Sequence, residues 1–339
     1  MLVVLILALP AIAQNLVLMN GSVIDGTGKA RMAANVRIRD GKIVDVGPFK
    51  PIAGETQLDV KGLIVAPGLI DLRSLTPAAI QRDPAAGSLI SQGVTTAVVG
   101  SDGTGPYLIE EFMLPFDEKP PGLNIAMLVG HATIRRQIMG PDYQRPATAD
   151  EIRRMGELVS DAMTQGAFGL GTDIQHEPAS FSTPEELRAL ANVLGKFGGT
   201  LVMNLRDENL KLGDSIKEAI GLARDAKIPV QILTDNKIAA AEIEKARAQR
   251  IDISADSYSL SQLARDRGIS LERGIQRMSA QPAAHMGLRE RGAVRKGVAA
   301  DLVIFNPQAP SALKYVIVNG TVALKDGQPT DARAGHALR

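Results

Sequence analysis

The sequence predicts an α/β protein with a parallel sheet, and three features of the chain support this class. Apolar runs recur about every 25 to 40 residues through the middle of the chain, separated by amphipathic helical stretches. Pairs such as Asn20-Gly21 and Asp40-Gly41 mark tight turns between short alternating strands. The segment YVIVNGTVALKDG at residues 315–327 has the same pattern of apolar and turn residues as LVLMNGSVIDG at residues 16–26. Both chain ends are therefore expected to form one small β-sandwich, with the middle inserted as a separate domain.

The inserted domain is predicted to be a (β/α) TIM-like barrel. Buried parallel strands are expected at residues 63–70, 95–100, 123–130, 167–171, 200–204, 228–233 and 251–255. Helices are expected at residues 149–165, 183–197, 210–226 and 238–250. A closed barrel needs an eighth strand, and no convincing one occurs between Tyr258 and the helical run at residues 270–279. The sequence thus indicates seven clear β-α units, and the eighth is doubtful.

The N-terminal residues 1–13 have the pattern of a signal peptide. An apolar run from Leu2 to Leu9 precedes Pro10 and the small-x-small word Ala11-Ile12-Ala13. The run is shorter than the roughly 20 residues that a stable membrane span needs. A secreted or periplasmic location is predicted, with a buried N-terminal strand or a misassigned start site as alternatives. The sandwich is then expected at residues 14–62 and 291–339, and the barrel at residues 63–290.

Composition excludes several classes of function. The 38 basic and 37 acidic residues leave a net charge of +1 with no block of like charge, which disfavours nucleic acid as a partner and favours a small molecule. The chain has no cysteine, so disulfides, thiolate metal sites and cysteine nucleophiles are excluded. No Gly-x-Ser-x-Gly word occurs, so the chain lacks the nucleophile elbow of serine hydrolases. The oligomeric state is not indicated.

Polar residues follow several predicted strands at their C-terminal ends, where barrel proteins carry their sites. The candidate ligand-binding residues are His131, Asp173, His176, Arg206, Asp256 and Tyr258. Each has a structural alternative. His131 can organise its loop, His176 can be a solvated loop residue, and Asp256 and Tyr258 can satisfy loop backbone groups. Arg206 can clamp an acidic ligand, or it can pair with Asp207, Glu208 or Asp173.

Several sequence motifs of the chain resemble those of one family. They are APGLID (residues 66–71), QGVTTAVVGSDG (92–103), LVGHATIRRQIMG (128–140), NLRDEN (204–209), ADSYS (255–259) and MSAQPAAHMGLRERGAVRKGVAADLVIFNP (278–307). Together they are similar to the D-aminoacylase, or N-acyl-D-amino-acid deacylase, branch of the amidohydrolase superfamily. The resemblance implies a barrel enzyme that uses zinc to remove acyl groups from D-amino acids.

The chain departs from the family at the metal-binding positions. Arg73 and Leu75 stand where the family has the two histidines of its first strand, and Asn204 and Thr234 stand where it has two more. Asp102 occupies the place of the bridging cysteine. After Tyr258 the sequence also lacks the segment in which the family carries its catalytic aspartate.

These departures predict a protein without a zinc cofactor. Zinc needs three or four converging donors, and arginine, leucine, asparagine and threonine are poor or impossible ligands. The leading hypothesis is a non-catalytic protein that binds either a small molecule or a protein partner such as an intact homologue. If Arg206 acts as a clamp, the small molecule is expected to be acidic. The alternative is an active metal-dependent hydrolase of amide bonds in N-acyl amino acids, with a rearranged site drawn from Asp102, His131, His176 and Asp256.

Overall fold

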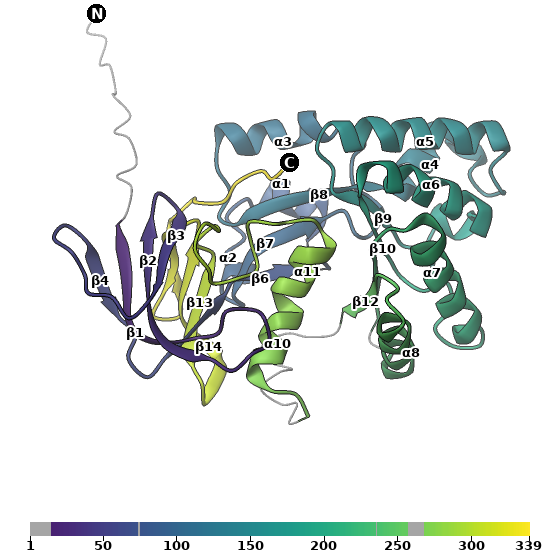
Figure 1. The fold of residues 1–339 in the computed structure, drawn as a ribbon. Helices are drawn as coiled ribbons and strands as arrows, with labels where there is room; N and C mark the ends of the chain where they lie inside the picture. The colour runs from purple at the N-terminus through teal and green to yellow at the C-terminus, as the bar shows by residue number, and fades with distance from the viewer. Residues whose placement is uncertain (1–14, 74, 235, 257–267) are drawn as a thin grey trace, which may run out of the picture.

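The structure, a computed structural model, describes residues 15–73, 75–234, 236–256 and 268–339. The predicted signal peptide and Tyr258 lie outside these ranges. Two sheets organise the described chain, one parallel and one mainly antiparallel, and helices pack around the parallel sheet (Figure 1). No helix among the described residues is long and apolar enough to cross a membrane.

The parallel sheet confirms the α/β class. Its strands follow one another in chain order, and all neighbouring pairs are parallel. They are β6 (Leu69–Asp71), β7 (Val94–Val99), β8 (Asn124–Gly130), β9 (Gly169–Thr172), β10 (Thr200–Met203), β11 (Val230–Leu233) and β12 (Ile253–Asp256). Within the described chain the sheet has its edges at β6 and β12, as in a half-barrel. The region searched for an eighth strand falls largely on residues 257–267, outside the description.

Helices connect successive strands and begin where the sequence supplies caps. They are α1 (Pro77–Arg82), α2 (Gly87–Ile90), α3 (Ile109–Glu118), α4 (His131–Met139), α5 (Ala149–Thr164), α6 (Pro184–Phe197), α7 (Leu212–Ala226) and α8 (Lys237–Ala248). Side chains of Thr148, Thr183 and Asn236 accept hydrogen bonds from the first turns of α5, α6 and α8. The four helices predicted between residues 149 and 250 are confirmed, with ends that differ by one or two residues.

The two faces of the parallel sheet bury different sets of side chains. One face packs against the surrounding helices in the largest apolar cluster, which includes Val99, Leu170 and Ile232. The other carries Val98, Leu128 and Val202, and these contact residues that follow α10 (Leu271–Met278), namely Ala283, Met286 and Leu288 within and after α11 (Ala280–His285). The α11 segment therefore fills the inner face of the half-barrel.

The second sheet joins both ends of the chain. Its strands are β1 (Leu16–Val23), β2 (Met32–Arg39), β3 (Lys42–Gly47), β4 (Thr56–Asp59), β5 (Ile64–Pro67), β13 (Leu302–Asn306), β14 (Ala309–Val318), β15 (Thr321–Lys325) and β16 (Gln328–Pro329). The two ends meet through β5, which pairs with β1 on one side and β13 on the other. Buried residues of both ends share one apolar cluster. The terminal unit is thus one continuous hydrogen-bonded sheet formed by both ends of the chain.

The predicted strand at residues 63–70 is divided between the two sheets. Its first half, β5, belongs to the terminal sheet, and its second half, β6, starts the parallel sheet. The break falls at Gly68, whose backbone N–H donates to the Asp301 carbonyl over 2.8 Å. A Cβ at this position would lie 2.1 Å from Thr95 Oγ1 of β7. Only glycine therefore lets the chain pass so close to the neighbouring strand while it changes sheets.

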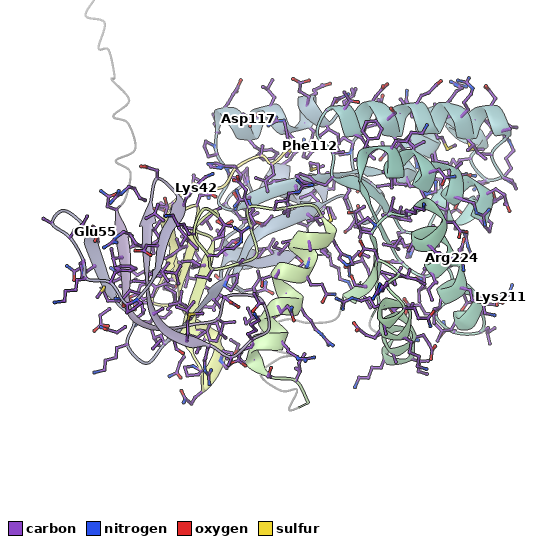
Figure 2. All side chains as sticks on the ribbon, viewed as in Figure 1. Lys42, Glu55, Phe112, Asp117, Lys211 and Arg224 are labelled. Atoms are coloured by element: carbon purple, nitrogen blue, oxygen red, sulfur yellow. The ribbon has the colours of Figure 1, made fainter. Side chains whose placement is uncertain are left out.

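A polar network and the C-terminal residues also connect the sheets. Asn124 at the start of β8 donates to Asp301 over 3.1 Å and accepts from Asn319 over 2.7 Å. Asp301 also pairs with Arg291. Arg339 forms an ion pair of 2.6 Å with Asp117 at the end of α3, which is labelled in Figure 2. The terminal sheet and the half-barrel are therefore joined by buried hydrogen bonds as well as by apolar packing.

Candidate functional site

A cavity of about 370 Å³ lies at the C-terminal tips of the parallel strands. It is lined by Arg73, Ser101, Asp102, Asp173, Gln175, Asn204, Glu208, Leu233 and Thr234. These residues end or follow β6, β7, β9, β10 and β11. Because parallel strands present their C-terminal ends at one edge, residues far apart in the sequence meet there, and this is the position of the site in barrel proteins.

The loop after β7 reaches the cavity because glycines allow close backbone contact. Gly130 of β8 donates to the Gly105 carbonyl over 2.9 Å. A Cβ on Gly105 would lie 2.0 Å from the Leu128 carbonyl oxygen, and one on Gly171 would lie 2.0 Å from the Gly100 oxygen. Residues 100–105 therefore press against the tips of β8 and β9. This contact places Ser101 and Asp102 on the cavity wall.

Local hydrogen bonds orient the carboxylates that line the cavity. Asp102 accepts from the N–H and the hydroxyl of Thr104, over 3.1 and 2.8 Å. Asp173 accepts from the Gln175 N–H over 3.1 Å and contacts His176 Nδ1 at 2.8 Å. Glu208 accepts from the Thr234 hydroxyl over 3.0 Å. Each carboxylate is held by its own loop or by the next strand, and each retains further capacity to accept hydrogen bonds.

Two lining side chains have no hydrogen-bond partner within the described part of the chain. Ser101 is only 4% exposed, and its hydroxyl faces the cavity without an acceptor or donor. Asn204 uses its backbone N–H to reach the Thr172 carbonyl over 3.3 Å, but its carboxamide makes no bond. Polar groups in such positions favour a bound molecule or water, since leaving them unpaired costs free energy.

Three of the four positions at which the family resemblance implies histidines lie on the cavity wall. Arg73, Asn204 and Thr234 line it, whereas Leu75 is 9% exposed and packs into the large apolar cluster. The described lining contains no imidazole, and no group of three or more histidine, aspartate or glutamate side chains is arranged to hold a metal among the described residues. This donor set does not fit zinc, which prefers nitrogen and sulfur donors in a tetrahedral arrangement.

His131 lies behind the cavity wall and is fully buried. Its Nδ1 is 2.8 Å from the Thr172 hydroxyl and its Nε2 is 2.8 Å from a Glu186 oxygen. Both ring nitrogens are therefore engaged by protein groups, and the ring does not line the cavity. Through Thr172, His131 supports the residue that precedes Asp173.

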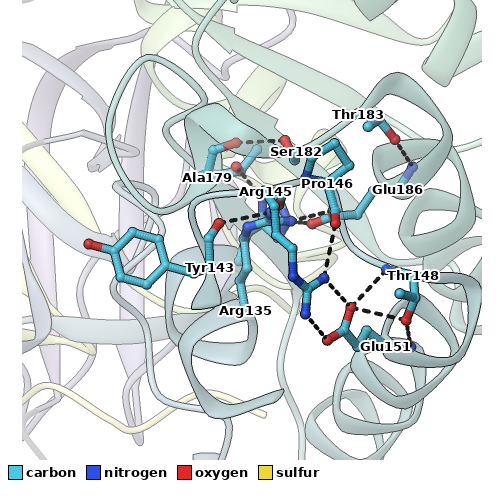
Figure 3. Close-up of polar contacts among 12 residues, drawn as sticks. Arg135, Tyr143, Arg145, Pro146, Thr148, Glu151, Ala179, Ser182, Thr183 and Glu186 are labelled. Atoms are coloured by element: carbon cyan, nitrogen blue, oxygen red, sulfur yellow. Dashed lines mark hydrogen bonds and ion pairs between the residues drawn. The ribbon is translucent and has the colours of Figure 1, made fainter. Parts of the chain in front are cut away.

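Arg135 completes this buried network. Its guanidinium pairs with Glu186 and donates to the Tyr143 carbonyl over 3.1 Å, as Figure 3 shows. Burial raises the pKa of Glu186, but the hydrogen bond from His131 and the charge of Arg135 outweigh burial, so this pKa lies below its usual value. The network joins α4, α6 and the tip of β9, next to Asp173 of the cavity wall.

Arg206 does not line the cavity. Its guanidinium binds both oxygens of Glu218, with Nη2 to Oε1 at 2.9 Å and Nε to Oε2 at 3.0 Å. A third donor reaches the Ser182 carbonyl over 3.1 Å. The partner is thus an acid in α7, and the sequence had suggested Asp207, Glu208 or Asp173. The arginine proposed as a clamp for an acidic ligand already holds a carboxylate of the protein.

The remaining candidates are dispersed. His176 contacts Asp173, but its side chain is 76% exposed and lies outside the lining. Asp256 ends β12, and Tyr258 is outside the described residues. The structure therefore does not gather His131 and His176 with Asp102 into one metal site. Sequence reasoning missed Ser101 and Gln175 and weighed Glu208 only as a partner of Arg206, although all three follow strand tips.

Comparisons with known proteins agree with the fold. The amidohydrolase family model matches residues 183–324. D-aminoacylase of Alcaligenes xylosoxydans xylosoxydans is 29% identical over 368 residues, which cover 94% of this chain and 75% of that protein. N-acyl-D-glutamate deacylase of the same organism is 28% identical, but the match spans only 56% of its length and 72% of this chain.

Solved structures give the same result. A crystal structure of D-aminoacylase superposes with a TM-score of 0.83 at 25% identity, covering 96% of this chain and all of that one. N-acyl-D-glutamate deacylase from Bordetella bronchiseptica shares the fold, with a TM-score of 0.83 at 21% identity over 96% of this chain and all of that one. Residues 183–324 therefore match an amidohydrolase domain, and the homologues and structural neighbours of the chain support a likeness to the D-aminoacylase branch of that superfamily.

Proposed function

We propose that this protein uses an amidohydrolase scaffold to bind a small polar molecule at the strand-tip cavity, without zinc-dependent hydrolysis. The observation that carries the proposal is the lining itself. Arg73, Asn204 and Thr234 occupy the wall at positions where the family resemblance implies histidines. The cavity is retained, while the groups around it are suited to hydrogen bonding.

The physical argument rests on what amide hydrolysis demands. A water molecule must become nucleophilic near neutral pH, which zinc achieves by lowering its pKa, and the leaving amine must receive a proton. The fixed charge of Arg73 on the wall repels a dication, and neither asparagine nor threonine replaces an imidazole. Residues of this chain can position a ligand, but the described lining offers no set of donors for zinc.

A second function has a specific observation in its favour. Three carboxylates line the cavity, and the curated relatives that match this chain include deacylases. A metal-dependent hydrolase of amide bonds in N-acyl amino acids, working with a rearranged site, is therefore the alternative proposal.

Metal analysis and a turnover assay separate the two proposals. Protein purified without chelators is expected to carry well below one zinc per chain and to leave N-acetyl-D-amino acids unhydrolysed. D-aminoacylase assayed in parallel controls for substrate and buffer. Stoichiometric metal together with turnover that a chelator abolishes would establish the alternative instead.

We also propose that residues 1–13 direct export, on the pattern of Leu2 to Ala13 alone. N-terminal sequencing of the protein recovered from a bacterial periplasm is expected to start at Gln14. An intact Met1 in the cytoplasmic fraction would contradict export.

A further inference from the structure

The charges around the cavity are unbalanced. Among the described residues that line it, Asp102, Asp173 and Glu208 are acidic and Arg73 is the only basic one. The three carboxylates follow three different strands, β7, β9 and β10, so separate loops supply them. Arg206, the arginine expected to attract an acidic ligand, is bound to Glu218 elsewhere.

A second observation, independent of charge, indicates that the cavity holds a ligand. The Ser101 hydroxyl belongs to a residue that is only 4% exposed, and within the described chain it has no partner although it faces the cavity. The carboxamide of Asn204 is also unpaired on the same wall. Ser101 is buried and Asn204 is half-buried, and a polar molecule in the cavity would give both side chains a hydrogen-bond partner.

We propose that the ligand is a small molecule with a free ammonium group and no net negative charge. This inference rests on the proposed binding function and specifies its ligand. An ammonium group has three N–H donors, and a carboxylate on the cavity wall accepts from them while neutralising its charge. Ser101 and Asn204 then bind a neutral polar part, such as an amide. The cavity volume of about 370 Å³ is at the low end for ligand pockets, which favours a molecule of amino-acid size.

The hydrogen bonds of the carboxylates prepare them for this role. Asp102 is held by Thr104, Asp173 by Gln175 and His176, and Glu208 by Thr234. These contacts fix the side chains before a ligand arrives, so less conformational entropy is lost on binding. An anionic ligand would meet three fixed negative charges at short range, which disfavours its binding.

Three derivatives of alanine test the charge preference. Alaninamide is cationic, N-acetylalaninamide is neutral and N-acetylalanine is anionic, and each is used in D and L forms. Calorimetric titration of the full chain is expected to show alaninamide binding at least about tenfold more tightly than N-acetylalanine, with weaker binding at high salt.

Variants connect the binding to the cavity. Glu208→Gln and Asp102→Asn are each expected to lower alaninamide affinity about tenfold, since both keep the shape and remove one charge. Ser101→Ala is expected to lower it less and without loss of stability, because the hydroxyl has no protein partner to lose. Glu157→Gln changes an exposed acid of α5 that does not line the cavity, so it is the matched control and should bind as the native protein does. Thermal unfolding of every variant confirms that it is folded.

The outcomes separate this inference from the function on which it rests. Tighter binding of N-acetylalanine, or affinity that does not change in either acid variant, would overturn the ammonium inference and leave a binding function in place. Saturable binding of Zn²⁺ or Mg²⁺ alone that competes with alaninamide would assign the carboxylates to a metal instead and so overturn it. Chelator-sensitive hydrolysis of N-acetylalanine would overturn the proposed function itself.

Discussion

Glu186 is a fully buried carboxylate that holds two basic side chains at once. One oxygen lies 2.8 Å from His131 and the other binds Arg135, and all three side chains are inaccessible to solvent. Such a cluster is costly to desolvate, and it is tolerated only because nearly every donor finds an acceptor. The cluster contacts Thr172, the residue before Asp173 of the cavity wall, although none of its own side chains lines the cavity.

Glu186→Gln is expected to destabilise the protein by about 3 kcal/mol or more, because Arg135 would remain charged and buried without its counter-ion. Its neighbour Glu185 is exposed at the start of the same helix, so Glu185→Gln is the matched control and should cost far less. Chemical denaturation at neutral pH measures both. Equal losses of unfolding free energy in the two variants would show that the buried network contributes no more stability than an exposed carboxylate does.

The N-terminus of α5 illustrates how one element is specified. The Thr148 hydroxyl accepts from the Glu151 N–H, while the Glu151 carboxylate accepts from the Thr148 N–H over 2.7 Å. The same carboxylate binds Arg145 through two bonds of 2.7 and 2.8 Å (Figure 3). The Arg145 hydrogen bond, followed by that of the Thr148 backbone, lowers the pKa of Glu151 to about 2.

The stability supplied by Glu151 should therefore depend on pH. Its pKa is lower in the folded state than the usual value of 4.5, so its contribution is fully present above pH 4.5 and is lost as the pH falls toward 2. Glu151→Gln is expected to cost about 1–2 kcal/mol at pH 7 and clearly less at pH 3. Urea unfolding at both pH values, with exposed Glu157→Gln as the control, measures the difference. A loss that is the same at both pH values would contradict this assignment.

The arrangement of the whole molecule depends on the junction between the terminal sheet and the half-barrel. Gly68 lies between β5 of one sheet and β6 of the other, in contact with Thr95. The hydrogen bonds among Asn124, Asp301 and Asn319 connect the same two parts. Because β6 also carries the chain to Arg73, the junction fixes one side of the cavity.

Gly68→Ala is expected to destabilise the protein by about 2 kcal/mol or more, since the added methyl group overlaps the Thr95 side chain. Gly221→Ala in α7 is the contrasting variant: nothing lies within 4 Å of its added Cβ, so it should stabilise the protein by about 0.5–1 kcal/mol. Thermal unfolding of the two variants measures both effects. A tolerated Gly68→Ala would show that the junction relaxes, and the close approach would not be the reason for glycine there.

The sequence by itself determined the class of fold and most of its elements. Apolar runs, capping residues such as Thr148 and turn pairs such as Asp40-Gly41 are local signals, because strand and helix periodicity and helix capping act over a few neighbouring residues. The prediction of a turn at Asn20-Gly21 was wrong, since both residues lie within β1, where the pairing with β2 shifts register. The motifs that resemble the family then located the C-terminal ends of the strands. Arg73, Asn204 and Thr234 follow these ends, and all three line the cavity.

Only the tertiary structure decided which of the polar candidates share a site. The sequence alone does not show that Arg206 binds Glu218 or that the buried His131 ring contacts Glu186. It also does not show that Ser101 and Glu208 line the cavity. It also treated residues 63–70 as one strand, whereas the nearby Thr95 side chain and the Asp301 carbonyl divide them at Gly68. The physical reason is the same in each case. Ion pairs, hydrogen bonds and close packing act through space at short range, and the fold determines which residues come within that range.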